Sequence, residues 1–283
     1  MTPTSWRAAA RRLRANKAAV AALSVIVSLV ALALLAPSFN PNTVEALDWS
    51  HVATGPALVH AHWFGTDRLG RDLFVRTLEG ARTSIAVGLA AGAVSLSLGL
   101  GFGAVAGYVG GRTDYWMMRL IEILSGLPLI FFVIFLTVIF GRNGAVLYVS
   151  IGAVGWLTMA RIVRGQALSI RRQEFIEAAV ACGASTARII GKHVVPNVLG
   201  PVIVYATLTV PQIILLESFL SFLGLGIQEP HASLGTLIAE GAAEMEAAPW
   251  ILLAPGLYLT VLLVCLNIFG DGLRDALDAR EPA

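Results

Sequence analysis

The side chains that could hold a metal ion or act as nucleophiles are few in this sequence, and they stand far apart. Cys182 and Cys265 lie in unrelated contexts without a Cys-x-x-Cys pattern, so neither a disulfide framework nor a thiolate metal site is expected. Among the five histidines, His60 and His62 are separated by one residue. Two histidines without further ligands bind a metal weakly, so we expect solvated loop side chains and no metal site there.

A phosphate-binding loop would need the pattern Gly-x-x-x-x-Gly-Lys followed by Ser or Thr. The nearest stretch ends in Gly191 and Lys192, but the preceding glycine, Gly183, is eight residues before Gly191, and His193 follows the lysine. We therefore expect no catalytic residues, no ATP hydrolysis and no cofactor bound by this chain.

Charged side chains could instead couple transport to an ion gradient if they lay in mid-membrane. Glu122 and Glu217 are the acidic candidates, but each stands near one end of an apolar segment, with no Lys, Arg or His in mid-membrane as its partner. Proton or sodium coupling is therefore disfavoured.

The composition of the whole chain indicates a membrane protein. The chain has 283 residues, of which 57% are hydrophobic and 13% are charged, with a mean hydropathy of +0.76. Soluble domains carry about 25% charged residues, so a soluble enzyme or a disordered chain is excluded. A net charge of +2 is too small to indicate a nucleic-acid partner. We expect an integral membrane protein in contact with lipid.

Six segments are long and apolar enough to cross a bilayer as helices, which takes roughly 20 residues. They are Lys17–Ala36, Ser84–Val109, Leu120–Phe140, Ala145–Val163, Val198–Leu220 and Trp250–Phe269. The first has a basic front like a secretory signal, but its apolar run is longer than a signal's core of about 7–15 residues.

Basic residues predict the orientation, since cytoplasmic loops are enriched in Lys and Arg. With both termini inside, only five of the 20 basic residues fall outside: Arg68, Arg71, Arg76, Arg82 and Arg142. Four of these precede the second span, in Thr66–Thr83, where Leu69, Leu73, Phe74 and Leu78 recur at helical spacing. We expect this segment to lie on the membrane surface as an amphipathic helix.

The loop between the fourth and fifth spans, residues 164–197, has the pattern of two short helices. Helix-forming residues run from Arg171 to Cys182, Gly183 breaks the run, and Ser185 can cap a second helix before Pro196. The alanines of the first helix would let a partner approach its backbone closely.

This loop resembles the EAA loop of ABC-transporter permeases, in which Glu-Ala-Ala is followed by glycine and, further on, by proline at fixed offsets. The residues in register are Glu177, Ala178, Ala179, Gly183 and Pro196. His193 and Val195 replace the motif's Ile and Leu. The resemblance implies that the loop couples the chain to a cytoplasmic ATPase.

Four further segments resemble C-type permeases of dipeptide, oligopeptide and nickel importers. They are Phe64–Gly88 with its Gly-Thr-Asp and Leu-Gly-Arg-Asp motifs, Asp114–Pro128, Glu217–Gly235, and the run LNIFGDGLRDALDAR near the C-terminus. Leu234 and Ala279 depart from the family's usual Trp and Pro.

The family resemblance implies an all-α polytopic membrane protein with six transmembrane helices and the type I ABC importer permease fold. The implied division is a cytoplasmic segment 1–16, a first span with its extracytoplasmic loop 17–83, a core 84–270 containing the coupling loop 164–197, and a cytoplasmic tail 271–283. The implied location is the bacterial inner membrane. The implied partners are a second permease subunit, two ATPase subunits that use ATP and Mg²⁺, an extracytoplasmic substrate-binding protein and a peptide substrate.

Polar residues of the fifth span suggest a substrate path. Tyr205, Thr209 and Gln212 recur at i, i+4 and i+7, which places them on one helical face. Pro211 can kink the span beside them. Ordinary hydrogen bonding between helices is the alternative explanation of these side chains.

Two further contact regions are expected. Segments around Glu217, Gly224 and Gly226 would meet the binding protein or the sister subunit. Glycines spaced by four along the second span, from Gly88 to Gly111, predict tight packing against a helix of this chain or of its sister.

The sequence alone also permits other functions. Within the family, nickel import is the alternative to peptide import, because the binding protein usually selects the substrate. Outside it, an ion-coupled secondary transporter would need mid-membrane carboxylates and inverted repeats. A membrane-anchored assembly protein would leave the EAA-like loop unexplained.

Overall fold

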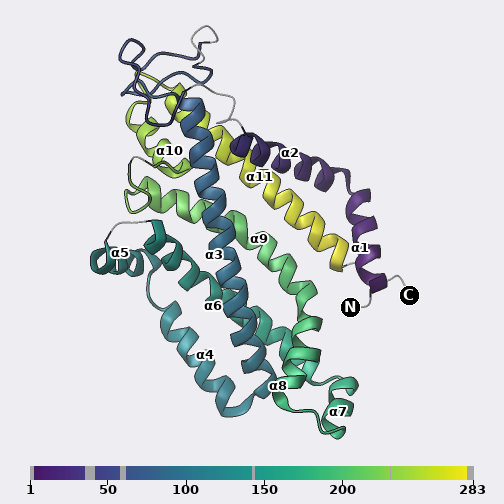
Figure 1. The fold of residues 1–283 in the computed structure, drawn as a ribbon. Helices are drawn as coiled ribbons and strands as arrows, with labels where there is room; N and C mark the ends of the chain where they lie inside the picture. The colour runs from purple at the N-terminus through teal and green to yellow at the C-terminus, as the bar shows by residue number, and fades with distance from the viewer. Residues whose placement is uncertain (1–2, 36–41, 58–61, 142–143, 230, 279–283) are drawn as a thin grey trace.

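The computed structural model describes residues 3–35, 42–57, 62–141, 144–229 and 231–278, and they form a bundle of long helices (Figure 1). The loop before α3 and helix α10 lie at one end, called here the α10 end, and α7 and α8 lie at the opposite, α7 end. The helices are α1 (Pro3–Ala15), α2 (Lys17–Leu35), α3 (Leu73–Val109), α4 (Gly111–Ser125), α5 (Leu129–Phe140), α6 (Gly144–Arg171), α7 (Glu174–Ala181), α8 (Thr186–Ile189), the π-helical turn η2 (Ile190–Val194), α9 (Val195–Phe222), α10 (Leu234–Ala243) and α11 (Trp250–Asp278).

The predicted membrane crossings are confirmed, with one of them bent. Among the described residues, five helical segments are long and apolar enough to cross a bilayer: Lys17–Leu35, Leu73–Val109, Val146–Arg171, Thr186–Phe222 and Trp250–Leu277. Helices α4 and α5 pass the same test together, with a bend of 83° between them. Counting this pair as one crossing gives the six expected spans.

The bend between α4 and α5 has a local cause. Gly126 ends α4, and Pro128 stands directly before α5 in extended backbone (φ −60°, ψ 129°). A residue before proline is disfavoured in helical backbone, so Leu127 cannot continue α4. The span predicted over Leu120–Phe140 is therefore divided between two helices.

The expected surface helix before the second span is instead the first part of α3. Asp72 caps this helix by accepting a hydrogen bond from the amide of Val75 at 2.9 Å. Leu73, Phe74 and Leu78 are at most 5% exposed, so their apolar face packs against protein rather than lipid headgroups. The helix that carries the second span therefore begins at the α10 end, well before Ser84.

Glycines on α3 allow α6 to approach it closely within the same chain. A Cβ atom on Gly103 would clash with the carbonyl oxygen of Ala160, and one on Gly107 would lie 2.6 Å from that of Arg164. Gly88 instead faces Ile214 of α9. The neighbour predicted by the glycine spacing is therefore α6, with α9 nearer the α10 end.

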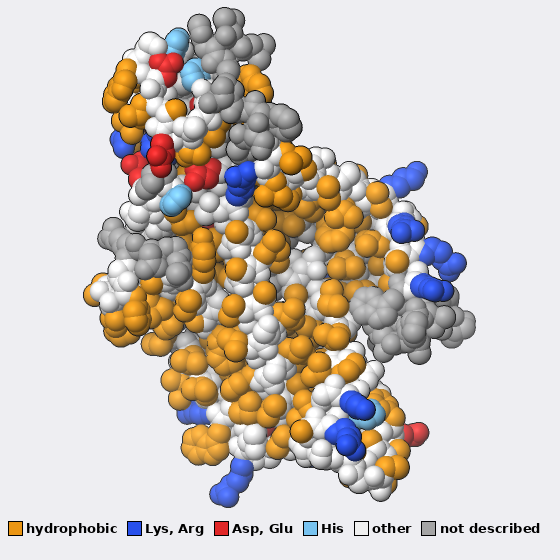
Figure 2. All heavy atoms as spheres, viewed as in Figure 1, with side chains coloured by type: hydrophobic (Ala, Val, Ile, Leu, Met, Phe, Trp, Pro, Cys, Tyr) orange, Lys and Arg blue, Asp and Glu red, His pale blue; other side chains and the backbone are white. Residues whose placement is uncertain are grey.

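The exposed surface matches a protein surrounded by lipid (Figure 2). Apolar side chains cover the flanks between the two ends, and charged side chains gather towards the ends and along α1. Leu89, Phe131 and Val138 are 59%, 68% and 78% exposed in this single chain. Exposed apolar surface on this scale needs lipid or partner subunits to cover it.

Candidate coupling and transport surfaces

The short helix α7 owes its ending to glycine. The amide of Ala184 donates to the carbonyl of Ala179 at 3.0 Å, and the amide of Gly183 donates to that of Val180 at 2.9 Å. This pair of bonds is a Schellman ending, which needs left-handed backbone at the position of Gly183, where φ is +79°. The fixed offset between Ala179 and Gly183 therefore has a direct structural reason.

Helix α7 is anchored by one side chain, and most of its remaining surface is exposed. Ile176 is 2% exposed, and Ala179 packs part-buried against the same cluster. Glu177 and Ala178 are exposed, and Val180 is 54% exposed. Glu177 also lies in the first helical turn, where a carboxylate interacts favourably with the helix dipole.

The second half of the loop runs into the fifth span without a break. Ser185 caps α8 by accepting a hydrogen bond from the amide of Arg188 at 3.4 Å, as predicted. Pro196 lies in the first turn of α9, directly after the wider turn η2. A proline ring clashes with the carbonyl four residues earlier, and the π-helical turn relieves this clash without ending the helix.

The two halves of the loop meet in the apolar cluster beneath α7, which connects them to three spanning helices. In this cluster, Ile176 packs with Val194 and Val198, and the phenyl ring of Phe175 lies 6.2 Å from the imidazole of His193. The other buried members are Ala104 of α3, Met159, Val163, Ala167 and Ile170 of α6, and Ile189 and Val202 of the α8–α9 segment. The cluster thus contains residues of α7, α3, α6 and α9.

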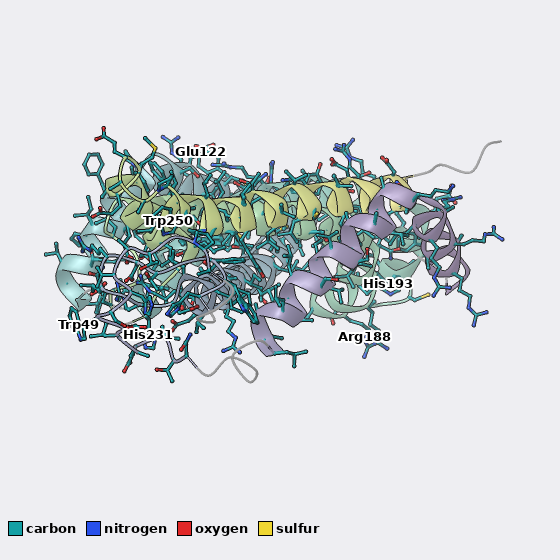
Figure 3. All side chains as sticks on the ribbon, turned by 90° about the horizontal axis from the view of Figure 1, so that it is seen from above. Trp49, Glu122, Arg188, His193, His231 and Trp250 are labelled. Atoms are coloured by element: carbon teal, nitrogen blue, oxygen red, sulfur yellow. The ribbon has the colours of Figure 1, made fainter. Side chains whose placement is uncertain are left out.

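Polar contacts reinforce the α7 end. The guanidinium of Arg164 on α6 bonds both carboxylate oxygens of Asp114 on α4, with distances of 2.5 and 2.6 Å. Figure 3 shows Arg188 and His193 together near α8 and η2, away from Trp49 and His231 of the α10 end. Arg188 and Lys192 are exposed and make this surface basic.

The predicted path residues lie on one exposed side of α9. Tyr205 is 39% exposed, Gln212 is exposed and Thr209 is half-buried between them. Leu215 and Phe219 continue this side at 56% and 49% exposure. The hydroxyl of Thr209 donates to the carbonyl of Tyr205 at 2.7 Å, within its own helix. These three side chains therefore share a face that is available to a substrate or a second subunit.

The expected outer contact residues divide into buried and exposed ones. Glu217 is fully buried, and its carboxylate accepts hydrogen bonds from Ser84 and Ser221, each at 2.7 Å. The predicted contact of Glu217 with an outer partner does not fit this burial. Gly226 is buried, and a Cβ there would clash with Ser221, whereas Gly224 is exposed with φ +76°. Of these expected contact residues, Gly224 is the exposed one.

A buried ion cluster explains why arginines lie at the α10 end. Arg71 and Arg76 both bond Oδ2 of Asp67, at 2.6 and 2.7 Å. Burial disfavours the charge of Arg71, but Asp67, Glu240 and Glu229 together outweigh it and raise the pKa of this guanidinium. Arg82 donates to the carbonyls of Ala33 and Leu34 at 2.6 Å and so caps the end of α2.

The histidine pair of the sequence analysis is only partly described, since His60 lies outside the described residues. His62 is 6% exposed, and its Nδ1 lies 2.8 Å from a carboxylate oxygen of Asp72. The expectation of a solvated loop histidine is therefore wrong for His62.

Two contacts that hold α7 and the α10 end in place were not predicted from the sequence. Ile176 anchors α7, and its signal was a lone large aliphatic residue between Glu174 and the alanines. The pairing of Arg76 with Glu240 at 2.6 Å joins residues 164 positions apart, and no local pattern indicated it.

Two protein-family models match this chain. Residues 99–281 match the family model for the binding-protein-dependent transport system inner membrane component. Residues 4–56 match that for the N-terminal TM domain of oligopeptide transport permease C.

Similar proteins match over nearly the whole chain. The oligopeptide transport system permease protein OppC of Haemophilus influenzae is 51% identical over 276 residues, covering 98% of this chain and 89% of that protein. OppC of Escherichia coli K12 is also 51% identical, with 98% and 91% covered. The dipeptide transport system permease protein DppC of Bacillus subtilis is 44% identical over 280 residues, with 99% and 86% covered.

A solved structure shares the fold. A chain of the inward-facing MetNI methionine ABC transporter aligns with a TM-score of 0.57 and 20% identity, covering 72% of this chain and 97% of that chain. The expected type I importer permease fold is confirmed by this likeness.

Proposed function

This chain belongs to the family of binding-protein-dependent transport system inner membrane components, and we propose that it is a permease subunit of an ATP-driven peptide importer. Relatives that match it over nearly its whole length are named as oligopeptide and dipeptide permeases, which favours peptides over nickel complexes. A second permease subunit would complete the path, two cytoplasmic ATPases would hydrolyse ATP, and an extracytoplasmic binding protein would deliver the substrate.

The exposed helix α7 is the observation that carries this proposal. Its outer surface offers Glu177, Ala178 and Val180, and its inner side chain Ile176 is locked into the cluster shared by α3, α6 and α9. A groove on an ATPase could receive a helix with such small side chains. Movement of that ATPase would then be transmitted to three spanning helices.

The proposed transport cycle is a rigid-body movement of packed helices. Helices α3 and α6 touch backbone to backbone at Gly103 and Gly107, so they resist sliding and move as one unit. Closure of the ATPase pair would carry α7 with it and tilt this unit and α9 between inward and outward access. The exposed side of α9 with Tyr205 and Gln212 would line the path, together with the sister subunit.

The charge distribution supports an orientation with α7 in the cytoplasm. The exposed cations Arg188 and Lys192 lie near α7, and the basic helix α1 lies beside the last part of α11. At the α10 end, Arg71 and Arg76 are offset by carboxylates, and Arg82 by the end of α2. Both termini would then face the cytoplasm of a bacterial inner membrane, in accord with the positive-inside rule.

Purification of the complex tests this function. A tagged chain, extracted from its native membrane in mild detergent, should bring along a second permease and two ATPase subunits. After reconstitution with the binding protein and internal ATP, labelled oligopeptides, dipeptides and a nickel complex can be compared for uptake. Recovery of the chain alone or as a homo-oligomer would contradict the importer, and ATP-driven uptake of nickel without peptide uptake would contradict the peptide assignment.

A further inference from the structure

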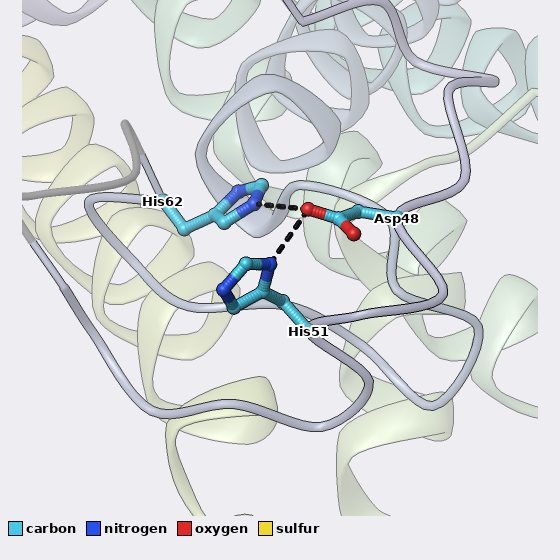
Figure 4. A group of neighbouring side chains, drawn as sticks. All are labelled: Asp48, His51 and His62. Atoms are coloured by element: carbon cyan, nitrogen blue, oxygen red, sulfur yellow. Dashed lines mark hydrogen bonds and ion pairs between the residues drawn. The ribbon is translucent and has the colours of Figure 1, made fainter.

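Three side chains of the α10-end loop converge in a way that neither the fold nor the proposed transport cycle requires (Figure 4). Asp48, His51 and His62 each offer one ligand atom, and these atoms all lie within 4.8 Å of one another. Oδ2 of Asp48 lies 2.8 Å from Nδ1 of His51 and 3.5 Å from Nε2 of His62. The His62 side chain is 8% exposed, whereas those of His51 and Asp48 are 27% and 38% exposed, which leaves the cluster open on one side.

The loop backbone holds each of the three residues in place. The amide of Asp48 donates to the carbonyl of Gly70 at 3.1 Å, and that of His51 donates to the carbonyl of Asp48 at 3.1 Å. The carbonyl of His51 accepts a hydrogen bond from the hydroxyl of Thr66. His62 pairs with Ala57 in an isolated β-bridge. The cluster is therefore preorganised rather than a chance meeting of mobile side chains.

Hydrogen bonding determines which atoms remain for a ligand. Ser50 bonds the Oδ1 atom of Asp48 through both its amide and its hydroxyl, which leaves Oδ2 facing the histidines. Nδ1 of His62 lies 2.8 Å from the Asp72 carboxylate, so this nitrogen must carry a hydrogen. Nδ1 of His51 lies equally close to Oδ2 of Asp48, so it carries a hydrogen that a bound metal ion would replace. In a neutral ring, Nε2 of His62 then presents its lone pair to Oδ2 of Asp48. Two lone pairs facing each other at 3.5 Å repel unless a cation lies between them.

We propose that Asp48, His51 and His62 form a binding site for a divalent transition-metal ion, with zinc as the best-fitting ion. Ligands about 2.0–2.2 Å from tetrahedral zinc lie roughly 3.3–3.6 Å apart. Nε2 of His62 already lies 3.5 Å from Oδ2 of Asp48, whereas Nδ1 of His51, at 2.8 Å, would move outward on binding. The ligand atoms of His51 and His62 lie within 4.8 Å of each other, and rotation of the partly exposed His51 ring would adjust this separation. Two imidazoles and one carboxylate suit zinc better than magnesium or calcium, which prefer oxygen ligands.

The surroundings of His62 support this site independently of its three ligands. Asp72 bonds the far nitrogen of His62, which is the outer carboxylate that commonly orients a metal-binding histidine. Asp72 in turn caps α3 through the amide of Val75. A bound ion would therefore tie the loop at Asp48 and His51 to the start of α3, and water would fill its fourth position. This inference revises the sequence expectation of a chain without a metal site.

Zinc binding by the intact complex tests the proposal. The full chain, purified with its accompanying subunits through a tag that lacks histidine, is stripped with chelator and dialysed against buffered free Zn²⁺. Bound zinc is measured by mass spectrometry, and Co²⁺ substitution is followed by visible absorption. The test variants are His51→Gln and Asp48→Asn, which leave the His62–Asp72 bond intact. His231→Gln is the matched control, since His231 is also a histidine of the α10 end that bonds a carboxylate, Glu79 at 3.2 Å.

The wild-type complex should hold one more zinc per copy of this chain than His51→Gln, and its Co²⁺ form should show the absorption bands of a four-coordinate site. Each test variant should bind zinc at least tenfold more weakly, and His231→Gln should bind it as the wild type does. Equal zinc content in the wild type and His51→Gln would overturn the proposal. A wild-type complex that binds no zinc would also overturn the proposal.

Discussion

The guanidinium of Arg76 on α3 forms two hydrogen bonds to the carboxylate of Glu240 on α10, at 2.6 and 3.0 Å. Arg76 is 1% exposed, and its Nη1 atom also lies 2.7 Å from Asp67. This one side chain thus joins the loop before the second span to the helix before the last one. It explains how arginines that oppose the positive-inside pattern can be accommodated at the α10 end.

Replacement of Arg76 should therefore be more damaging than replacement of an exposed arginine. Arg76→Ala would remove both hydrogen bonds to Glu240 and one of the two guanidiniums that bond Asp67. Breaking a buried ion pair costs up to about 3–5 kcal/mol, and Arg71 would offset part of this loss. We expect a clear fall in the unfolding temperature of the detergent-solubilised chain, with Arg68→Ala as the exposed control. Unfolding temperatures that agree between the two variants would show that the cluster does not stabilise the fold.

Local sequence patterns predicted most of the helices but not the contacts between distant residues. Hydropathy located the crossings because a bilayer demands long apolar runs. The helix ending at Gly183 and the cap at Ser185 were also predictable, since both depend on residues within a few positions. The start of α3 was missed because the alternation of charged and apolar residues around Arg76 fits a surface helix equally well.

In the candidate sites too, features set by neighbouring residues could be predicted, and contacts between distant residues could not. The face shared by Tyr205 and Gln212 followed from helical spacing alone. Burial of Glu217 depends on Ser84, 133 residues earlier, and the convergence of Asp48 with His62 depends on how an irregular loop folds. Spacing along the chain holds no information on such pairs.

Close packing of α3 on α6 can be tested with two glycines that are two residues apart. Gly103→Ala would push a methyl group into the backbone of Ala160, and overpacking of this kind costs roughly 1–3 kcal/mol. On Gly101 a Cβ meets nothing within 4 Å, so Gly101→Ala should gain up to about 1 kcal/mol from helix propensity. Thermal unfolding in detergent should rank Gly101→Ala above the wild type and Gly103→Ala below it. The opposite order would contradict the packing.

Docking of an ATPase on α7 can be blocked without disturbing the Ile176 anchor. Ala178 is exposed, so Ala178→Trp should leave the fold intact while adding bulk where the partner approaches. We expect at least a tenfold loss of co-purifying ATPase, with the second permease retained. Ala242→Trp is the control, because Ala242 is an exposed helical alanine of α10, at the opposite end. Normal ATPase recovery with Ala178→Trp would exclude this surface as the docking site.

The buried carboxylate of Glu217 distinguishes ATP-driven from ion-coupled transport. A structural role predicts that Glu217→Gln keeps the contacts with Ser84 and Ser221 and retains ATP-driven uptake. Glu217→Leu would leave both hydroxyls without this acceptor, at a cost of about 1–3 kcal/mol in stability. Uptake into proteoliposomes with and without an imposed proton gradient provides the measurement. Loss of uphill uptake in a stable Glu217→Gln variant would favour ion coupling.

The exposed side of α9 is expected to influence substrate passage rather than assembly. Tyr205→Ala combined with Gln212→Ala should change the rate or selectivity of peptide uptake by at least several-fold, because both side chains face outward from the bundle. Thr209→Val and Thr207→Val form a matched pair, since each hydroxyl donates to the carbonyl four residues earlier, at 2.7 and 2.9 Å. They lie roughly 160° apart around the helix, so only Thr209→Val should alter uptake. An assembled complex whose uptake is unchanged by the double substitution would exclude this face from the path.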